Sequence, residues 1–159
     1  MSSNKIREIL NQFGFSFHIR DFPESTRTSL DAAKAIGCNV SQIAKSILFE
    51  GEKTKNPILV IASGSNRINE KQIESEIGEK IKKADAEFVK NKTGYSIGGV
   101  PPIGHNEKIQ IFIDKDLMQQ GEIWAAAGTP HSVFSLNPKQ LLQITHGKIL
   151  EITDSYKNL

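Results

Sequence analysis

The sequence contains one cysteine, Cys38, and no hydrophobic run long enough to cross a bilayer. A single thiol can form neither an internal disulfide nor a cage of thiolate metal ligands. Apolar stretches such as residues 58–62 fall far short of the ~20 residues that a membrane helix needs. Residues 1–5 also lack a signal-peptide pattern. We therefore expect a cytoplasmic protein with no membrane association.

Charge of one sign is also scarce. The chain has 20 Lys and Arg residues against 18 Asp and Glu residues, a formal net charge of +2. That excess is too small to predict nucleic-acid binding by itself, although a local basic patch would still permit it. Apolar residues make up 38% and charged residues 24% of the sequence, which excludes wholesale disorder, collagen and a coiled coil.

The length indicates a single domain. A chain of 159 residues buries roughly 68–70% of its unfolded surface, so it needs no disulfide or metal to fold. The sequence has no internal repeat, no low-complexity segment and no linker rich in Pro, Gly or Ser. We expect one domain over residues 1–159, and a monomer.

Hydrophobic periodicity predicts a mixture of helices and strands. Helices are expected over residues 6–13, 29–36 and 138–144, with shorter ones after Asn69 and Asp85. Strands are expected over residues 15–22, 45–50, 57–62, 108–114, 122–127 and 148–152. Isoleucines alternate with other residues in the strand over 108–114, which should therefore be buried on one face only. Because helices and strands do not alternate strictly, we predict a mixed α/β (α+β) domain with a largely antiparallel sheet.

Several of these helices carry recognisable end signals. Thr28 or Ser29 can cap the helix over 29–36, and Gly37 suits its C-terminal turn. Residues 69–72 resemble a capping box, and Asn137 precedes a proline at the first helical position.

A loop rich in glycine and proline runs from residue 94 to 105. It contains four glycines and two prolines. Gly98 and Gly99 can adopt positive φ and bring bare backbone amides close to a ligand, while Pro101 and Pro102 stiffen the second half of the loop. The loop is either a preformed wall whose amides bind an oxyanion or an elaborate turn, and residue chemistry alone favours neither.

Residues 94–98 also match the G-x-S-x-G pattern of serine hydrolases, with Ser96 as the nucleophile. Asp114, Asp116 and His131 follow in the hydrolase order. That motif requires a strand before the serine and a helix after it, whereas a charged, helix-like segment precedes Ser96 and Gly-Val-Pro-Pro comes after the motif. We interpret the match as a coincidence.

Two basic side chains have both a functional and an ordinary interpretation. Lys45 stands at the mouth of a strand, where a lysine is usually solvated but can also bind phosphate or polarise a carbonyl. His131 follows the small residues 125–128 and could shuttle protons, although a lone histidine is more often structural. The four histidines are far apart and show no metal-ligand spacing, so we predict no metal.

The ordered motifs of the chain resemble the YbaK or prolyl-tRNA-synthetase-associated editing domain family. The matching segments are residues 27–33, 42–46, 60–64, 84–87, 98–105 and 127–129. The resemblance implies a mixed α/β fold around a curved, mostly antiparallel sheet flanked by helices. It also implies a trans-editing deacylase that hydrolyses the ester between a wrong amino acid and a tRNA. The likeness covers nearly the whole chain.

Such editing has a physical reason. A binding pocket discriminates poorly against a smaller side chain, because one methylene is worth only about 1–3 kcal/mol. The resemblance therefore implies tRNA(Pro) carrying Cys or Ala as substrate, with prolyl-tRNA synthetase as a candidate partner and no cofactor.

The resemblance also implies roles for particular residues. The near-invariant lysine of the family corresponds to Lys45, and its G-x-x-x-P element fits residues 98–102, so Lys45, Gly98 and Gly99 become the candidate catalytic residues. Candidate substrate-binding residues are Thr28, Ser46, Ser63, Gly64, Pro101, Gly128 and His131. Some members have an aspartate after the glycine that corresponds to Gly64, where this chain has Ser65 and Asn66.

The implied mechanism needs no protein nucleophile. Lys45 would fix the terminal phosphate or the carbonyl, loop amides would bind the developing oxyanion, and water would attack an ester that is already activated. Two alternatives stay open: a non-catalytic module that binds tRNA or a synthetase, and a serine esterase that uses Ser96.

Overall fold

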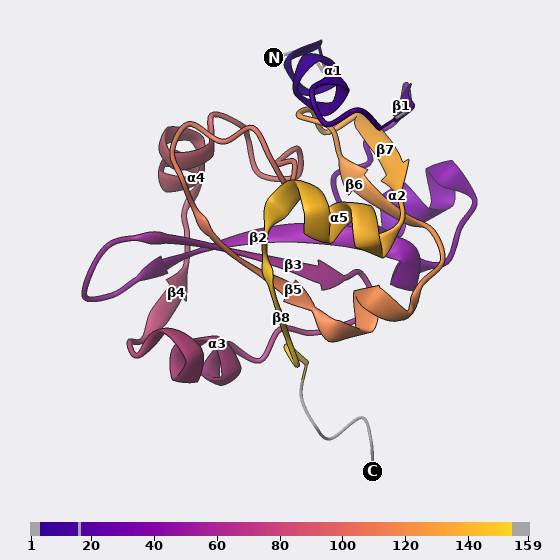
Figure 1. Ribbon diagram of the computed structural model, residues 1–159. Coiled ribbons are helices and arrows are strands. Elements are labelled where there is room, and N and C mark those ends of the chain that lie inside the picture. The colour runs from indigo at the N-terminus through magenta and orange to yellow at the C-terminus, as the bar shows by residue number, and fades with distance from the viewer. Residues whose placement is uncertain (1–3, 16, 154–159) are drawn as a thin grey trace.

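The computed structural model describes residues 4–15 and 17–153. Within that part of the chain, five α-helices and two short 3-10 turns surround a mixed sheet (Figure 1). The helical elements are α1 (Asn4–Asn11), α2 (Ser29–Ile36), η1 (Val40–Gln42), α3 (Glu70–Ile77), α4 (Ala86–Thr93), η2 (Lys115–Gln119) and α5 (Pro138–Thr145).

The sheet has eight strands in the described residues. They are β1 (Ile19–Asp21), β2 (Ile43–Gly51), β3 (Pro57–Ser63), β4 (Ile81–Lys83), β5 (Gln110–Asp114), β6 (Ile123–Ala126), β7 (Ser132–Leu136) and β8 (Lys148–Leu150). The order across the sheet is β1-β7-β6-β2-β3-β5-β8, and β4 pairs with β2 beside this path.

The mixed α+β prediction is confirmed. Four strand pairings are antiparallel (β1 with β7, β6 with β7, β2 with β3, and β2 with β4). Three are parallel (β2 with β6, β3 with β5, and β5 with β8). The sheet is thus antiparallel by a narrow majority.

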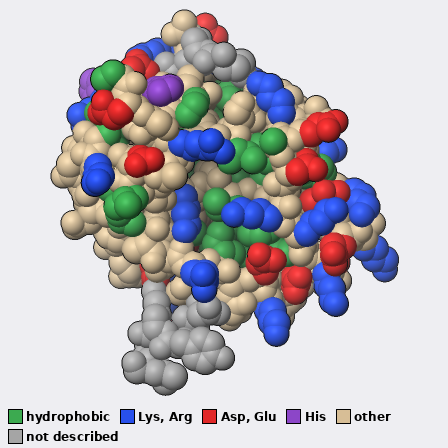
Figure 2. Space-filling model, turned by 180° about the vertical axis from the view of Figure 1, so that it is seen from behind, with side chains coloured by type: hydrophobic (Ala, Val, Ile, Leu, Met, Phe, Trp, Pro, Cys, Tyr) green, Lys and Arg blue, Asp and Glu red, His purple; other side chains and the backbone are tan. Residues whose placement is uncertain are grey.

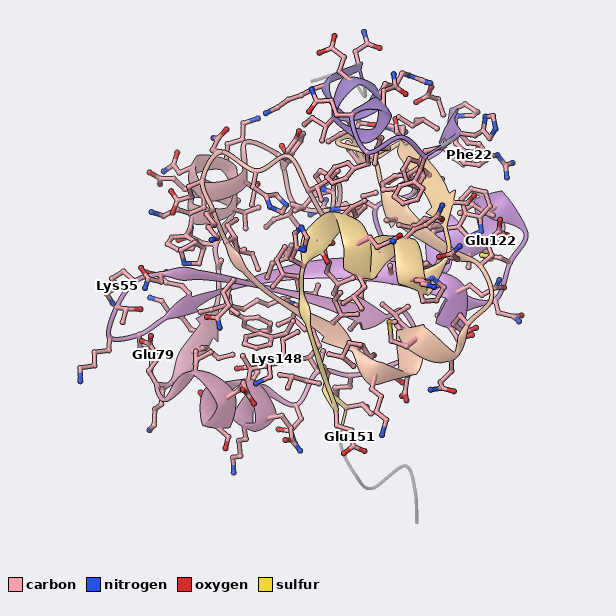
Figure 3. The ribbon with its side chains drawn as sticks, viewed as in Figure 1. Phe22, Lys55, Glu79, Glu122, Lys148 and Glu151 are labelled. Carbon is pink, nitrogen blue, oxygen red and sulfur yellow. The ribbon has the colours of Figure 1, made fainter. Side chains whose placement is uncertain are left out.

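The β2–β3 hairpin forms the centre of the sheet. All seven residues of β3 are buried, as expected for a strand rich in β-branched residues that is covered on both faces. Lys55 lies at the tip of the hairpin and Glu79 lies beside it (Figure 3). The Glu79 carboxylate accepts hydrogen bonds from Thr54 and from the amide of Lys53, and these bonds lower the pKa of Glu79. The turn is therefore tied to the segment after α3.

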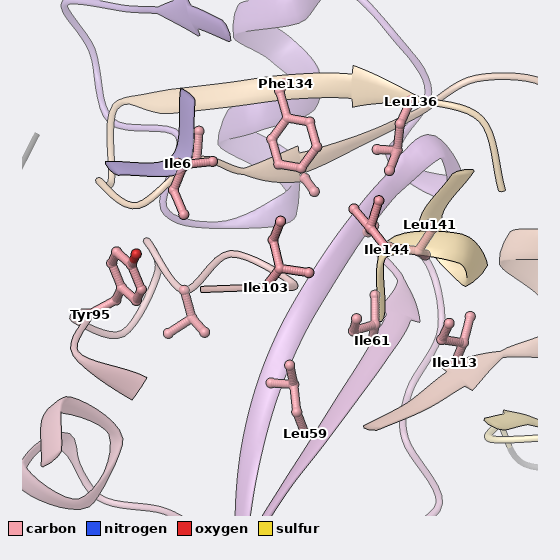
Figure 4. Close-up of a cluster of buried hydrophobic side chains, with 14 of the residues drawn as sticks. Ile6, Leu59, Ile61, Tyr95, Ile103, Ile113, Phe134, Leu136, Leu141 and Ile144 are labelled. Atoms are coloured by element: carbon pink, nitrogen blue, oxygen red, sulfur yellow. The ribbon is translucent and has the colours of Figure 1, made fainter. Parts of the chain in front are cut away.

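Hydrophobic side chains are buried on both faces of the sheet. One face carries the larger core, to which α1, α4 and α5 contribute (Figure 4). Figure 4 shows Ile61 of β3 near Leu141 and Ile144 of α5, with Leu59 farther along the same strand. On the other face, α3 packs over one end of the sheet through Ile73, and α2 packs over the other end through its alanines.

The predicted end signals form as expected in α2 and α5. The Thr28 hydroxyl accepts a hydrogen bond from the amide of Asp31, and Gly37 ends α2 in the left-handed conformation with φ of 86°. A capping box closes the start of α5 between Asn137 and Gln140. At α3 the cap is simpler than predicted, because the Asn69 side chain accepts from Lys71 rather than from the third helical residue.

Three predictions about elements are wrong in detail. Helix α1 ends at Asn11, before the predicted limit, and Phe13 is 39% exposed. Only Ile19–Asp21 of the predicted strand over 15–22 is β structure, while residue 16 lies outside the described residues. Strand β5 is not half-buried: Phe112 is fully buried, because β5 is a parallel strand between β3 and β8 with side chains packed on both faces.

Candidate functional site

A cleft of about 270 Å³ opens where the start of α2, the first half of β2, strand β6 and the glycine-rich loop meet. Its walls are mainly apolar, as is usual for small-molecule sites. The lining residues are Thr26, Arg27, Thr28, Ser29, Ala32, Ile43, Ala44, Lys45, Ser46, Ile47, Ile97, Gly98, Val100, Trp124, Ala125, Ala126 and Val133. Seen from behind, the molecule shows apolar side chains in a hollow with Lys and Arg side chains beside it (Figure 2).

Four of the predicted site residues line this cleft. Thr28 comes from the cap of α2, Lys45 and Ser46 from β2, and Gly98 from the loop after α4. These positions are far apart in the sequence, and the packing of α2 and the loop against the same strand brings them together. The cleft is therefore a tertiary feature built around β2.

Neighbouring residues lie so close to the loop that glycine is required at positions 98 and 99. Gly98 has a φ of +90°, and a Cβ there would lie 2.2 Å from Cγ of Arg27. A Cβ at Gly99 would lie 2.9 Å from the carbonyl carbon of Thr129. Gly99 does not line the cleft, and its amide donates to the carbonyl of Ser96 at 2.9 Å. Gly98 is thus the loop glycine that lines the cleft, whereas Gly99 packs the loop against the turn after β6.

Lys45 is half-buried at the cleft wall. Its Nζ donates to the backbone carbonyl of Asn66 at 2.5 Å. Burial lowers the pKa of Lys45, the carboxylate of Asp114 opposes that shift, and the nearby charge of Lys83 adds to it. Lys45 is therefore a cation whose proton is held less tightly than that of a surface lysine.

A buried carboxylate holds the residues beside Lys45 in place. It was not among the predicted site residues. Asp114, at the end of β5, is 1% exposed and accepts hydrogen bonds from the Ser63 amide at 3.0 Å and from the Asn66 side chain at 2.8 Å. The Asn66 side chain also donates to Asp116. Asp114 thereby holds Asn66, whose carbonyl receives Lys45. The available signal was an acidic residue at the end of an otherwise apolar strand.

Ser63 and Gly64 lie behind the cleft wall and do not line it. The Ser63 hydroxyl donates to the carbonyl of Ser41 at 2.8 Å, and Ser63 is 1% exposed. A Cβ at Gly64 would lie 2.5 Å from the carbonyl oxygen of Val40 and 2.8 Å from Cβ of Ser29. Both residues allow the end of β3 to pack closely under the elements that form the cleft.

Three further predicted residues also lie outside the cleft lining. The carbonyl of Pro101 is bonded to Nε2 of His105 at 2.7 Å, which ties the loop to its own end. Gly128 takes a φ of +99° beside the buried ring of Tyr95. His131 is exposed, and its Nδ1 lies 3.1 Å from the carbonyl of Glu24. The structure therefore does not bring His131 to Lys45 and Gly98.

Arg27 and Trp124 line the cleft but were not singled out by sequence reasoning. Arg27 is exposed, its stem packs on Gly98, and its guanidinium has no ion pair among the described residues. Trp124 packs with Ile43 and Val133 in the core under α2. Arg27 directly precedes the α2 cap, whereas nothing in the sequence distinguished Trp124 from an ordinary core residue.

The serine-hydrolase geometry is absent. Helix α4 precedes Ser96 where a nucleophile elbow needs a strand, and a turn comes after it where the elbow needs a helix. Within residues 4–15 and 17–153, no three His, Cys, Asp or Glu side chains are grouped so that they could hold a metal ion. In the same part of the chain, every helix is too short or too polar to cross a membrane.

The family model described as the aminoacyl-tRNA editing domain matches residues 23–144. The chain belongs to this family. The match runs from the segment before α2 to the end of α5, so it includes every residue of the cleft.

Relatives of the editing domain resemble the chain over most of its length. Protein YwhH of Bacillus subtilis, whose activity is uncharacterised, is 31% identical over 94% of both chains. EbsC of Enterococcus faecalis, a candidate Cys-tRNA(Pro)/Cys-tRNA(Cys) deacylase, is 26% identical over 76% of this chain and 74% of its own. A solved structure of a candidate trans-editing enzyme for prolyl-tRNA synthetase is 37% identical, with a TM-score of 0.90 over 98% of this chain and 99% of that one.

Proposed function

We propose that the protein is a trans-editing deacylase that hydrolyses the ester of mischarged tRNA, with tRNA(Pro) carrying Cys or Ala as the substrate. Membership of the editing family and the names of two relatives support this activity. The observation that carries the proposal is the cleft itself. It combines one half-buried ammonium group, a glycine loop and small apolar walls.

The proposed mechanism uses positioning and electrostatics. The 3′-terminal adenosine ester enters the cleft, where the exposed Arg27 attracts its phosphate and Lys45 fixes either that phosphate or the ester carbonyl. The amide of Gly98, which has no acceptor among the described residues, donates to the carbonyl oxygen as that oxygen becomes negative. Water then attacks the carbonyl carbon, the C–O bond to the ribose breaks, and the ribose oxygen takes a proton. The products are a free amino acid and an uncharged tRNA.

The size of the cleft supports a small aminoacyl group. Its volume of about 270 Å³ lies just below the usual range of ~300–1,000 Å³ for ligand pockets. Part of that space must hold ribose and base, so a short side chain such as that of Ala or Cys fits best.

We also propose the domain organisation, the oligomeric state, the partner and the compartment of the protein. Residues 1–159 act as one domain, because this chain alone matches most of the length of these relatives. We propose that this domain works as a monomer. The substrate is mischarged tRNA, with prolyl-tRNA synthetase as the partner whose errors are corrected. Since aminoacylation and translation share a compartment, the site of action is the cytoplasm, and no cofactor takes part.

The decisive experiment measures ester hydrolysis on proline tRNA charged separately with Ala, Cys, Ser and Pro. We expect rapid loss of Cys or Ala and retention of Pro. In Lys45→Ala the rate should fall by about 100-fold or more, which is typical when a preorganised electrostatic contact to the reacting group is removed. Ser96→Ala should retain the wild-type rate.

Other outcomes would assign the protein to the alternatives. Loss of hydrolysis in Ser96→Ala alone would identify a serine esterase. Binding of tRNA with no hydrolysis of any ester would identify a non-catalytic module. Retained hydrolysis in Lys45→Ala, with the fold intact by circular dichroism, would remove Lys45 from the mechanism.

A further inference from the structure

One stretch of β2 has no neighbouring strand on the side that faces the cleft. β2 pairs with β6 only at residues 43–44 and with β4 only at residues 49–51. Between these pairings, residues of the loop over 97–100 lie opposite β2 and line the same cavities. The edge of β2 is therefore open at residues 45–47.

Backbone hydrogen bonds on either side fix the direction of the groups at this edge. The carbonyl of Ile43 faces β3, because it accepts the amide of Gly64 at 2.8 Å. The carbonyl of Leu48 faces the opposite side, because it accepts the amide of Ala84 at 3.0 Å. Backbone groups alternate sides along a strand, and the β2–β3 register is uninterrupted. Ser46 therefore directs both its N–H and its C=O away from β3, toward the cleft.

Three polar groups of Ser46 are left without a protein partner. Among the described residues neither its amide nor its carbonyl has a hydrogen bond on this side. Its hydroxyl is buried and also lacks a partner there. Buried polar groups are rarely unsatisfied, so the hydroxyl calls for a partner, and the amide and carbonyl offer a ligand in the cleft one donor and one acceptor. Ser46 lines the main cleft and an adjoining cavity of about 50 Å³.

Apolar side chains flank these polar groups. Ile47, Ile97 and Val100 line both cavities. Ile97 is 42% exposed, so part of its apolar surface is open to a ligand in the cleft. A flat ring with apolar faces and a polar edge would cover Ile97 and pair with Ser46. An added peptide strand fits less well, because pairing with β6 and the bond to Ala84 close the edge on both sides.

We infer that the open edge at Ser46 binds the adenine of the 3′-terminal nucleotide. This inference rests on the proposed function. Adenine carries an amino group with a ring nitrogen acceptor on each side, N1 and N7. The Ser46 carbonyl accepts from the amino group, and the Ser46 amide donates to one of the two ring nitrogens. Ser46 thereby fixes the base while Lys45 and Gly98 address the ester.

The substrate side of the inference is tested with altered terminal nucleotides. Proline tRNA would be prepared with adenosine, purine riboside, 1-deazaadenosine or 7-deazaadenosine at the 3′ end and charged with the amino acid that is removed. We expect kcat/KM to fall about tenfold for purine riboside, which lacks the amino group, and for one of the two deaza analogues. Equal rates for all four substrates would overturn the inference.

The protein side is tested by replacing one backbone amide with an ester. The α-hydroxy acid equivalent of serine at position 46 keeps the side chain and removes the N–H donor. We expect the penalty of the sensitive deaza analogue to vanish in this variant. The same replacement at Phe49, whose amide faces β3, is the matched control and should retain the penalty. An unchanged penalty in the variant at position 46 would contradict the assignment.

A binding measurement separates this inference from the proposed function. Adenosine 5′-monophosphate and purine riboside 5′-monophosphate would be titrated into ¹⁵N-labelled protein. We expect the Ser46 amide resonance to shift with the first and much less with the second. If Ser46 responds but no charged tRNA is hydrolysed, the proposed activity fails and the adenine site stands. If hydrolysis occurs with no dependence on the base and no shift at Ser46, the adenine site fails alone.

Discussion

At the scale of single residues, the cleft depends on a cation held in partly buried surroundings. The Lys45 ammonium donates to the Asn66 carbonyl. The Asn66 side chain in turn donates to Asp114, which holds Asn66 in place. Removing water from around a charged group favours its neutral form, whereas a nearby carboxylate favours the charged form. Burial is the larger effect at Lys45, so its pKa is lowered.

This shift predicts a pH dependence of hydrolysis. Since the protonated form of Lys45 attracts the phosphate or carbonyl, activity should fall on the alkaline side at a pH below the ordinary lysine value of 10.5. Arginine does not titrate in this range, so Lys45→Arg should move the alkaline limb of kcat/KM to higher pH whatever activity it retains. Rates corrected for spontaneous ester hydrolysis check this, and an identical limb in both proteins would contradict it.

His105 predicts a pH dependence of stability. Burial lowers its pKa below the ordinary 6.5, although its bond to the Pro101 carbonyl opposes the shift. The unfolded chain therefore binds a proton at mildly acidic pH before the folded chain does, and the free energy of unfolding falls as pH drops below 6.5. In His105→Gln, whose amide can still reach Pro101, the change between pH 7.5 and 5.5 should shrink. Urea denaturation at both pH values measures it, and an unchanged difference would exclude His105 as the cause.

At the scale of elements, helix caps were the most predictable feature of the fold. Thr28 and Asn137 each accept a hydrogen bond from an amide of the first helical turn, at 3.0 and 2.8 Å. Capping depends on residues three positions apart, so it can be read from the sequence. The two caps differ in place: Thr28 lines the cleft, whereas Asn137 opens α5 on the opposite face of the sheet.

The two caps form a matched pair of variants. Thr28→Ala and Asn137→Ala should each lower the free energy of unfolding by ~1 kcal/mol, because each leaves one helix amide unsatisfied. Only Thr28→Ala should also lower kcat/KM for ester hydrolysis. Chemical denaturation and deacylation rates for both variants provide the test. Equal loss of activity in the two would mean that Thr28 acts through stability alone.

At the scale of the whole molecule, the small net charge limits attraction to a polyanion. With a formal charge of +2, association with tRNA depends on the cations beside the cleft rather than on a general positive field. Arg27 and Lys45 line the cleft, and Lys83 is close enough to affect the pKa of Lys45. These three side chains would neutralise only two or three phosphates.

The salt dependence of activity should therefore be modest. We expect log kcat/KM to fall against log salt concentration with a slope of about −2, and Arg27→Ala to reduce its magnitude by about one. Lys55→Ala is the control, because Lys55 lies at the hairpin tip (Figure 3) and does not line the cleft. A slope unchanged in Arg27→Ala would mean that Arg27 contacts no phosphate.

The sequence by itself determined most of the local elements and the family, although the strands β4 and β7 were not predicted. The spacing of apolar residues and the capping residues act over a few positions, so α2 and α5 were predictable almost to the residue. Ordered short motifs were sufficient to indicate an editing domain and to select Lys45 and Gly98, both of which line the cleft.

Only the tertiary structure decided which of those residues meet. The parallel pairing of β3 with β5 brings Asp114 to Ser63 from 51 positions away, and no local pattern records that contact. The same holds for the turn at His131, which packs beside Glu24 instead of entering the cleft. The open edge at Ser46 arises because β6 and β4 pair with different parts of one strand. Strand pairing at long range is set by the packing of the whole sheet, and it fixes where unpaired backbone groups face a ligand.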